Sequence, residues 1–198
     1  MKRLLSRPTV YDALQRALGS TACDRTFVGE HVRPVAGDRV LDLACGTGRI
    51  LGALPDGVRY LGFDVSPEYI DAARRKWGSR GEFHSADVRE ITVPSDSFER
   101  VLMMGVLHHL DDESCRTVLG FGARALTLDG CLVAIDGVRS EHEGRLARWL
   151  VRSDRGGYVR RADEYAELAK PFFGSVEART RDDLLRVAYP HVVLECRR

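Results

Sequence analysis

The sequence lacks the features of an exported, membrane-spanning or disulfide-linked protein. Its basic start is followed by Ser6, Arg7 and Pro8, where a signal peptide needs a continuous apolar stretch. No apolar run approaches the roughly 20 residues of a membrane-spanning helix. The five cysteines are scattered and form no Cys-x-x-Cys pair, which argues against a disulfide framework and against a structural zinc site. We therefore expect a cytoplasmic protein without membrane association.

An excess of charge of one sign is also lacking. Thirty Lys and Arg residues stand against 29 Asp and Glu residues, a formal net charge of +1, so no strong overall field favours nucleic acid as a partner. The six histidines show no His-x-x-x-His spacing, and we assign no metal. A hydrophobic content of 44% with 30% charged residues over 198 residues is typical of one folded globular domain.

Short apolar runs alternate with amphipathic stretches along the whole chain. This alternation predicts an α/β fold of the Rossmann-like, doubly wound kind, with helices on both faces of a mostly parallel seven-stranded sheet and an antiparallel last strand. The expected strands are 39–44, 60–65, 81–84, 98–104, 131–136, 176–180 and 191–196.

Helices are expected before and between these strands. Ser66 and Pro67 have the residue types of a helix cap and a first helical position. We expect one domain over 1–198, with N-terminal helices in 1–33 and a substrate lid in 137–175. The predicted helices are 11–18, 26–32, 49–54, 68–77, 113–126, 141–153 and 162–171.

The strongest motif is a glycine turn that follows the first apolar run, with the sequence VLDLACGTG over 40–48. Glycines at such a turn let backbone amides approach a ligand closely, because a side chain would occupy the ligand's space. A tight strand-to-helix turn without a ligand is the alternative. The surrounding acids favour a ligand.

Two acids flank this turn. Asp64 ends the next strand, 18 positions after Gly46, where a carboxylate can accept hydrogen bonds from the hydroxyls of an adenosine ribose. A nicotinamide-dependent oxidoreductase would also carry this acid, but Gly52 is one residue too late for Gly-x-Gly-x-x-Gly. Asp42 would repel a pyrophosphate and suits a ligand with sulfonium and ammonium charges.

These motifs resemble, in order and spacing, the class I S-adenosylmethionine-dependent methyltransferases over about residues 26 to 136. The resemblance implies S-adenosylmethionine as cofactor and S-adenosylhomocysteine as product. It places Asp42 and the turn glycines at the methionine part, Asp64 at the ribose, and Asp87 with the Val88 amide at the adenine. Ala44 departs from the family, which often has glycine there. The predicted cofactor-binding residues are Asp42, Ala44, Gly46, Gly48, Asp64, Val65, Asp87, Val88, Met104 and Gly105.

The acceptor side of the site is expected after the fourth and fifth strands. His108 and His109 follow Gly105, and we take His109 as a candidate general base and His108 as structural. Asp136 is the second catalytic candidate, because ligands collect at the carboxyl ends of parallel strands. The segment that follows contains arginines suited to phosphate or carboxylate groups, or to solvent. Its candidates are Arg139, His142, Arg152, Arg155, Tyr158, Arg160 and Arg161.

Three functions remain open on this evidence. The first is an enzyme that transfers a methyl group from S-adenosylmethionine to oxygen, nitrogen or carbon of a small molecule, as a monomer or homodimer. The second is an NAD(P)-dependent Rossmann oxidoreductase. The third is a non-catalytic subunit that binds the cofactor and holds a partner.

Overall fold

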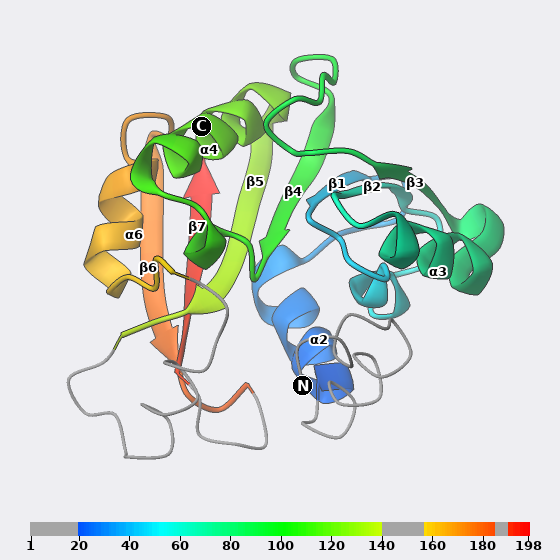
Figure 1. Ribbon diagram of the computed structural model, residues 1–198, viewed down its shortest axis with the longest axis horizontal. Helices are drawn as coiled ribbons and strands as arrows, with labels where there is room; N and C mark the ends of the chain where they lie inside the picture. The colour runs from blue at the N-terminus through cyan, green and yellow to red at the C-terminus, as the bar shows by residue number, and fades with distance from the viewer. Residues whose placement is uncertain (1–19, 140–156, 185–189) are drawn as a thin grey trace.

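Seven strands form a single sheet in the order β3-β2-β1-β4-β5-β7-β6 (Figure 1). The computed structural model describes residues 20–139, 157–184 and 190–198. The strands are β1 Arg39–Leu43, β2 Arg59–Asp64, β3 Gly81–Ser85, β4 Phe98–Met104, β5 Leu126–Gly137, β6 Ser175–Arg181 and β7 His191–Arg197.

The strand directions match the predicted fold class. β1 pairs in parallel with β2 and with β4, β2 with β3, and β4 with β5. β7 runs antiparallel to both β5 and β6. A Rossmann-like, mostly parallel seven-stranded sheet with an antiparallel last strand is therefore confirmed.

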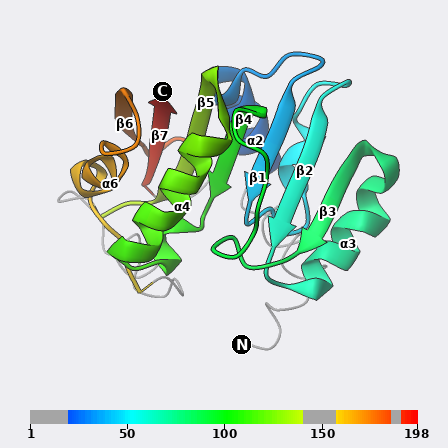
Figure 2. The same cartoon turned by 90° about the horizontal axis from the view of Figure 1, so that it is seen from above.

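Helices cover both faces of the sheet, as predicted, and Figure 2 shows α4 and α2 on opposite sides of it. One apolar cluster joins the sheet to α4 and α6, and a second joins it to α2, η1 and α3. The helices are α2 Ser20–Phe27, α3 Pro67–Trp77, α4 Asp112–Ala125 and α6 Ala162–Ala169, with short turns η1 Val28–Val32, η2 Arg49–Gly52, η3 Gly78–Arg80 and η4 Leu107–His109.

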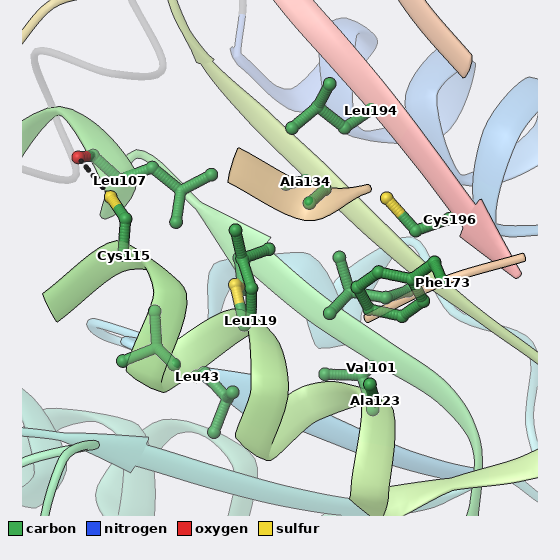
Figure 3. Close-up of a cluster of buried hydrophobic side chains, with 14 of the residues drawn as sticks. Leu43, Val101, Leu107, Cys115, Leu119, Ala123, Ala134, Phe173, Leu194 and Cys196 are labelled. Atoms are coloured by element: carbon green, nitrogen blue, oxygen red, sulfur yellow. Dashed lines mark hydrogen bonds between the residues drawn. The ribbon is translucent and has the colours of Figure 1, made fainter. Parts of the chain in front are cut away.

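The core beneath α4 holds the turn after β4 in place (Figure 3). Leu119 of α4 packs with Val101 of β4 and Leu194 of β7, and all three are buried. The Cys115 thiol of α4 donates a hydrogen bond to the Leu107 carbonyl at 3.4 Å. The helix is thus tied to the loop that begins at the carboxyl end of β4.

Several predicted boundaries are wrong. The helix expected over 26–32 begins earlier, because α2 starts at Ser20 and η1 continues it to Val32. The helix expected over 49–54 is a single turn, Arg49–Gly52, because Pro55 disfavours helical backbone at the residue before it. The fifth strand begins at Leu126 instead of 131, since Leu126 already pairs with Phe98. The pairing register then shifts at the predicted turn 128–130, so that the turn lies within the strand as an irregularity.

The proposed N-terminal helices and the lid are described only in part. Residues 11–18 and 141–153, both expected to be helical, lie outside the described residues. Within 137–175, α6 packs against α4 and β6, so this part of the segment belongs to the helical layer. The lid stays a prediction. None of the helices in the described ranges has the length and apolar character of a membrane span.

Candidate cofactor site

The glycine turn over 44–48 leaves part of its backbone open. Ala44, Gly46 and Gly48 all have positive φ, at 70°, 56° and 66°. The Cys45 amide donates to the Phe63 carbonyl at 2.8 Å, which fixes the turn to the end of β2. A Cβ placed on Gly46 would meet no atom within 4 Å. A ligand can therefore approach the backbone at Gly46.

Asp42 lies in β1, two residues before this turn, and is 1% exposed. The Tyr60 hydroxyl donates to its Oδ2 at 2.6 Å, whereas its Oδ1 has no hydrogen-bond partner in the described part of the chain. Burial raises the pKa of Asp42 to about 7, the Tyr60 hydrogen bond opposes this rise, and the charge of Asp64 adds to it. Such a buried, half-satisfied carboxylate is costly unless a cationic partner compensates it.

Asp64 connects the end of β2 to the glycine turn. Its Oδ2 accepts the Gly46 amide at 2.8 Å and its Oδ1 accepts the Ser66 amide at 2.9 Å. Burial raises the pKa of Asp64, and these two amides oppose the rise. Each carboxylate oxygen can accept a second hydrogen bond, so ribose hydroxyls can share this group. Val65 beside it is 71% exposed, so it offers an apolar surface against which the adenine ring can pack.

Asp87 lies just beyond the end of β3 and is engaged by a cation. Arg89 donates to its Oδ1 through the backbone amide and Nε, both at 2.9 Å, and to its Oδ2 through the guanidinium at 2.5 Å. The Arg89 side chain, followed by its amide, lowers the pKa of Asp87 to about 2. Asp87 is therefore charged at any pH near neutrality and able to accept an adenine amino group. Val88 packs against the core.

The segment 104–109 at the end of β4 is the one expected to line the acceptor side of the site, and it is called the reaction loop below. Met104 is half-buried, and Gly105 follows with φ of 66°. The two histidines lie in η4, where their ring centroids are 4.0 Å apart. His108 is buried and His109 is exposed. Of the two, His109 is thus the one that a substrate can reach.

Asp136, near the end of β5, holds this loop. It is 1% exposed, and its carboxylate accepts the amides of Leu107 at 2.8 Å and His108 at 3.3 Å. It also bonds the Nδ1 atom of His108. These contacts suit a positioning residue. The catalytic role expected for Asp136 stays a prediction.

Arg160 is buried, and its contacts differ from the ligand contacts that the sequence suggests. Its guanidinium donates to the carbonyls of Leu107 at 3.1 Å, Leu110 at 2.8 Å and Tyr158 at 3.0 Å. It also pairs with Asp112 at 2.7 Å. Arg160 thus ties the chain after β5 to the loop after β4.

The other candidates in this segment fall into three groups. Arg139 pairs with Glu164 and Arg161 with Asp163, both on the surface. Tyr158 is 49% exposed, and its amide donates to the His108 carbonyl at 3.0 Å, which places it beside the reaction loop. His142, Arg152 and Arg155 lie outside the described residues.

Asp24 is a candidate that the sequence analysis did not find. It lies on α2, is 2% exposed, and forms an ion pair with Arg49, the residue after the glycine turn. No motif signals this acid, because the pair joins residues 25 positions apart. Its charge adds to the raised pKa of Asp42.

Comparisons with known proteins find methyltransferases among the relatives of this chain. Residues 40–130 match the family model described as a methyltransferase domain. A tRNA U34 carboxymethyltransferase of Shewanella sp. strain W3-18-1 is 28% identical over 154 residues, covering 74% of this chain and 42% of that protein. A demethylmenaquinone methyltransferase of Clavibacter sepedonicus is 35% identical over 88 residues, covering 43% and 36%. The chain thus spans less than half the length of these curated relatives.

Solved structures share the fold over almost the whole chain. A TehB-like S-adenosylmethionine-dependent methyltransferase from Corynebacterium glutamicum has a TM-score of 0.69 at 19% identity, covering 96% of this chain and 98% of that one. Sheet order and glycine turn thus define an α/β fold of the methyltransferase kind. The matched methyltransferase domain and the shared fold support the resemblance to the class I S-adenosylmethionine-dependent methyltransferases that the sequence motifs indicate. S-adenosylmethionine is the cofactor of this class.

Proposed function

We propose that the protein transfers a methyl group from S-adenosylmethionine to a small-molecule acceptor. The observation that carries this proposal is the buried carboxylate of Asp42, whose Oδ1 is unpaired among the described residues beside an open glycine turn. A buried negative charge at this place attracts a cationic ligand and repels a pyrophosphate. It therefore favours an adenosyl cofactor with a positively charged amino-acid part over a nicotinamide dinucleotide.

In this proposal each of the three acids contacts a different part of the cofactor. Asp42 faces the methionine part, Asp64 accepts the ribose hydroxyls and Asp87 accepts the adenine amino group. Val65, exposed at the same edge, contacts the adenine face. The fit rests on the charge and exposure of these groups.

The reaction needs alignment more than it needs a catalytic side chain. When bound, S-adenosylmethionine supplies an electrophilic methyl group and a neutral leaving group. The chain's own residues orient the acceptor against it and exclude water. Asp136 fixes the turn that carries His109, and His109 takes the proton when the acceptor is a hydroxyl or an amine. A carboxylate acceptor would need no base.

A small-molecule acceptor is favoured by the surface beside the reaction loop. Tyr158 presents a half-exposed ring next to η4, a surface on which a planar acceptor can stack. The net charge of +1 gives little attraction to a polyanion. One relative is named for methylating demethylmenaquinone and another for modifying tRNA, so tRNA is the rival acceptor.

Methyl transfer can be followed with S-adenosylmethionine labelled in its methyl group. The purified protein is incubated with a metabolite extract or with total tRNA, and label is counted in each fraction. We expect label in the low-molecular-weight fraction. The Asp64→Asn variant should transfer little, whereas Asp71→Asn, which alters an exposed acid of α3, should behave as the unaltered protein. Label in nuclease-sensitive RNA would contradict the small-molecule acceptor and leave the methyltransferase assignment intact.

A further inference from the structure

α2 places Asp24 beside the glycine turn, where it pairs with Arg49. η1 continues α2 to Val32, whose carbonyl accepts a hydrogen bond at 2.8 Å from Arg100, close to the amino end of β4. The opposite end of α2 is therefore directed toward the carboxyl ends of the strands. There Asp24 pairs with Arg49, directly after Gly48. Figure 1 shows α2, in blue, against the sheet beside β1 and β4.

Asp24 is buried with only half of its carboxylate satisfied. Arg49 binds its Oδ2 atom. Its Oδ1 atom has no hydrogen-bond partner in the part of the chain that the structure describes. Burial raises the pKa of Asp24, and the charge of Arg49 and its hydrogen bond oppose the rise. An unsatisfied oxygen on a residue that is 2% exposed is costly, and each such group in a native protein calls for an explanation, of which a bound ligand is one.

Asp24 and Asp42 share an unsatisfied carboxylate oxygen and lie close enough for their charges to interact. Each is buried, each has an unpartnered Oδ1 among the described residues, and the charge of Asp24 raises the pKa of Asp42. Asp64 adds a third carboxylate at the turn, while Arg49 offsets part of the negative charge. A compact cation with several hydrogen-bond donors would satisfy both open oxygens.

We propose that Asp24 is a cofactor-binding residue whose Oδ1 accepts a hydrogen bond from the α-ammonium group of the cofactor's amino-acid part. This inference rests on the proposed function, because it assumes an adenosyl cofactor that ends in an amino acid. It makes α2 a wall of the cofactor site. It also makes Asp24 a specificity residue that distinguishes cofactors with the amino group from those without it.

Calorimetric titration with two ligands tests this role. The ligands are S-adenosylhomocysteine and its analogue without the α-amino group, measured at pH 8, where Asp42 is largely ionised. The unaltered protein should bind the deaminated analogue about tenfold to a hundredfold more weakly, the range for a hydrogen bond to a charged group. In Asp24→Asn, the affinity for S-adenosylhomocysteine should fall by a similar factor, while that for the analogue should stay unchanged.

Two further variants keep the test decisive. Asp24→Glu retains the charge and the pairing with Arg49 but moves the carboxylate, so it should lose part of the affinity for S-adenosylhomocysteine and none for the analogue. Asp71→Asn, the exposed matched control, should bind both ligands as the unaltered protein does. Equal losses for both ligands in the Asp24 variants, or no loss, would overturn this inference and leave the proposed function standing. Failure of the unaltered protein to bind either ligand would overturn both.

Discussion

We expect Asp42 to make cofactor binding depend on pH near neutrality. Its pKa is raised to about 7 by burial, and a cationic ligand binds the ionised form. If binding requires the ionised carboxylate, the affinity for S-adenosylhomocysteine should rise about tenfold from pH 6 to pH 8. Titration calorimetry across this range measures the effect. In Asp42→Asn the affinity should be lower and independent of pH.

Asp87 provides the matched control. Its pKa is about 2, so it stays ionised over the same range, and Asp87→Asn should weaken binding by the same factor at pH 6 and pH 8.

The titration of Asp42 also affects the stability of the unliganded protein. Because its pKa is higher in the folded chain than the ordinary 3.8, its contribution to the free energy of unfolding decreases as pH rises from 3.8 to about 7. A pH-independent affinity in the unaltered protein would contradict this role of Asp42.

Ala44 and Gly48 both have positive φ, but substitutions at the two positions should change stability in opposite directions. Ala44 has a φ of 70°, which disfavours any residue with a Cβ, so Ala44→Gly should raise the free energy of unfolding by about 0.5–1 kcal/mol after the entropy of glycine is subtracted. A Cβ on Gly48 would lie 2.7 Å from Phe83. Gly48→Ala should therefore lower that free energy by about 3 kcal/mol. Urea denaturation of both variants compares them, and equal effects would be inconsistent with this account.

At the scale of the elements, the sequence shows local patterns better than it shows boundaries. β1, β2 and β4 could be predicted because buried apolar runs end at polar or glycine residues. The short η2 could not, because apolar spacing over 49–54 suits a helix and the effect of Pro55 decides where it ends. The early start of β5 depends on Leu126 pairing with Phe98, a contact between distant residues that no local pattern encodes.

The loop after β4 depends on one buried arginine from the segment after β5. Arg160 donates to three carbonyls and pairs with Asp112. Arg160→Ala removes one donor from each of these carbonyls and leaves a cavity in a buried place, so it should lower the free energy of unfolding by about 2–3 kcal/mol. Its neighbour Arg161 pairs with Asp163 on the surface, so Arg161→Ala should cost less than about 1 kcal/mol. Denaturant unfolding distinguishes the two, and equal costs would argue against Arg160 as the anchor of the loop.

At the scale of the whole molecule, the candidate site depends on contacts between elements. The sequence predicts Asp42, Asp64 and Asp87 because each lies within a recognisable strand or just after one. It does not predict that Asp136 holds the His108 turn, or that Asp24 pairs with Arg49, because these residues are 28 and 25 positions apart. Only the folded sheet brings them to one edge.

We propose that this edge of the sheet binds an adenosyl cofactor with a cationic amino-acid part. The most direct measurement is calorimetric titration of the protein at pH 8 with S-adenosylhomocysteine and, separately, with NAD. Because the buried carboxylate of Asp42 disfavours a pyrophosphate, we expect S-adenosylhomocysteine to bind at least about a hundredfold more tightly than NAD. NAD binding as tightly as S-adenosylhomocysteine, or more tightly, would contradict the claim.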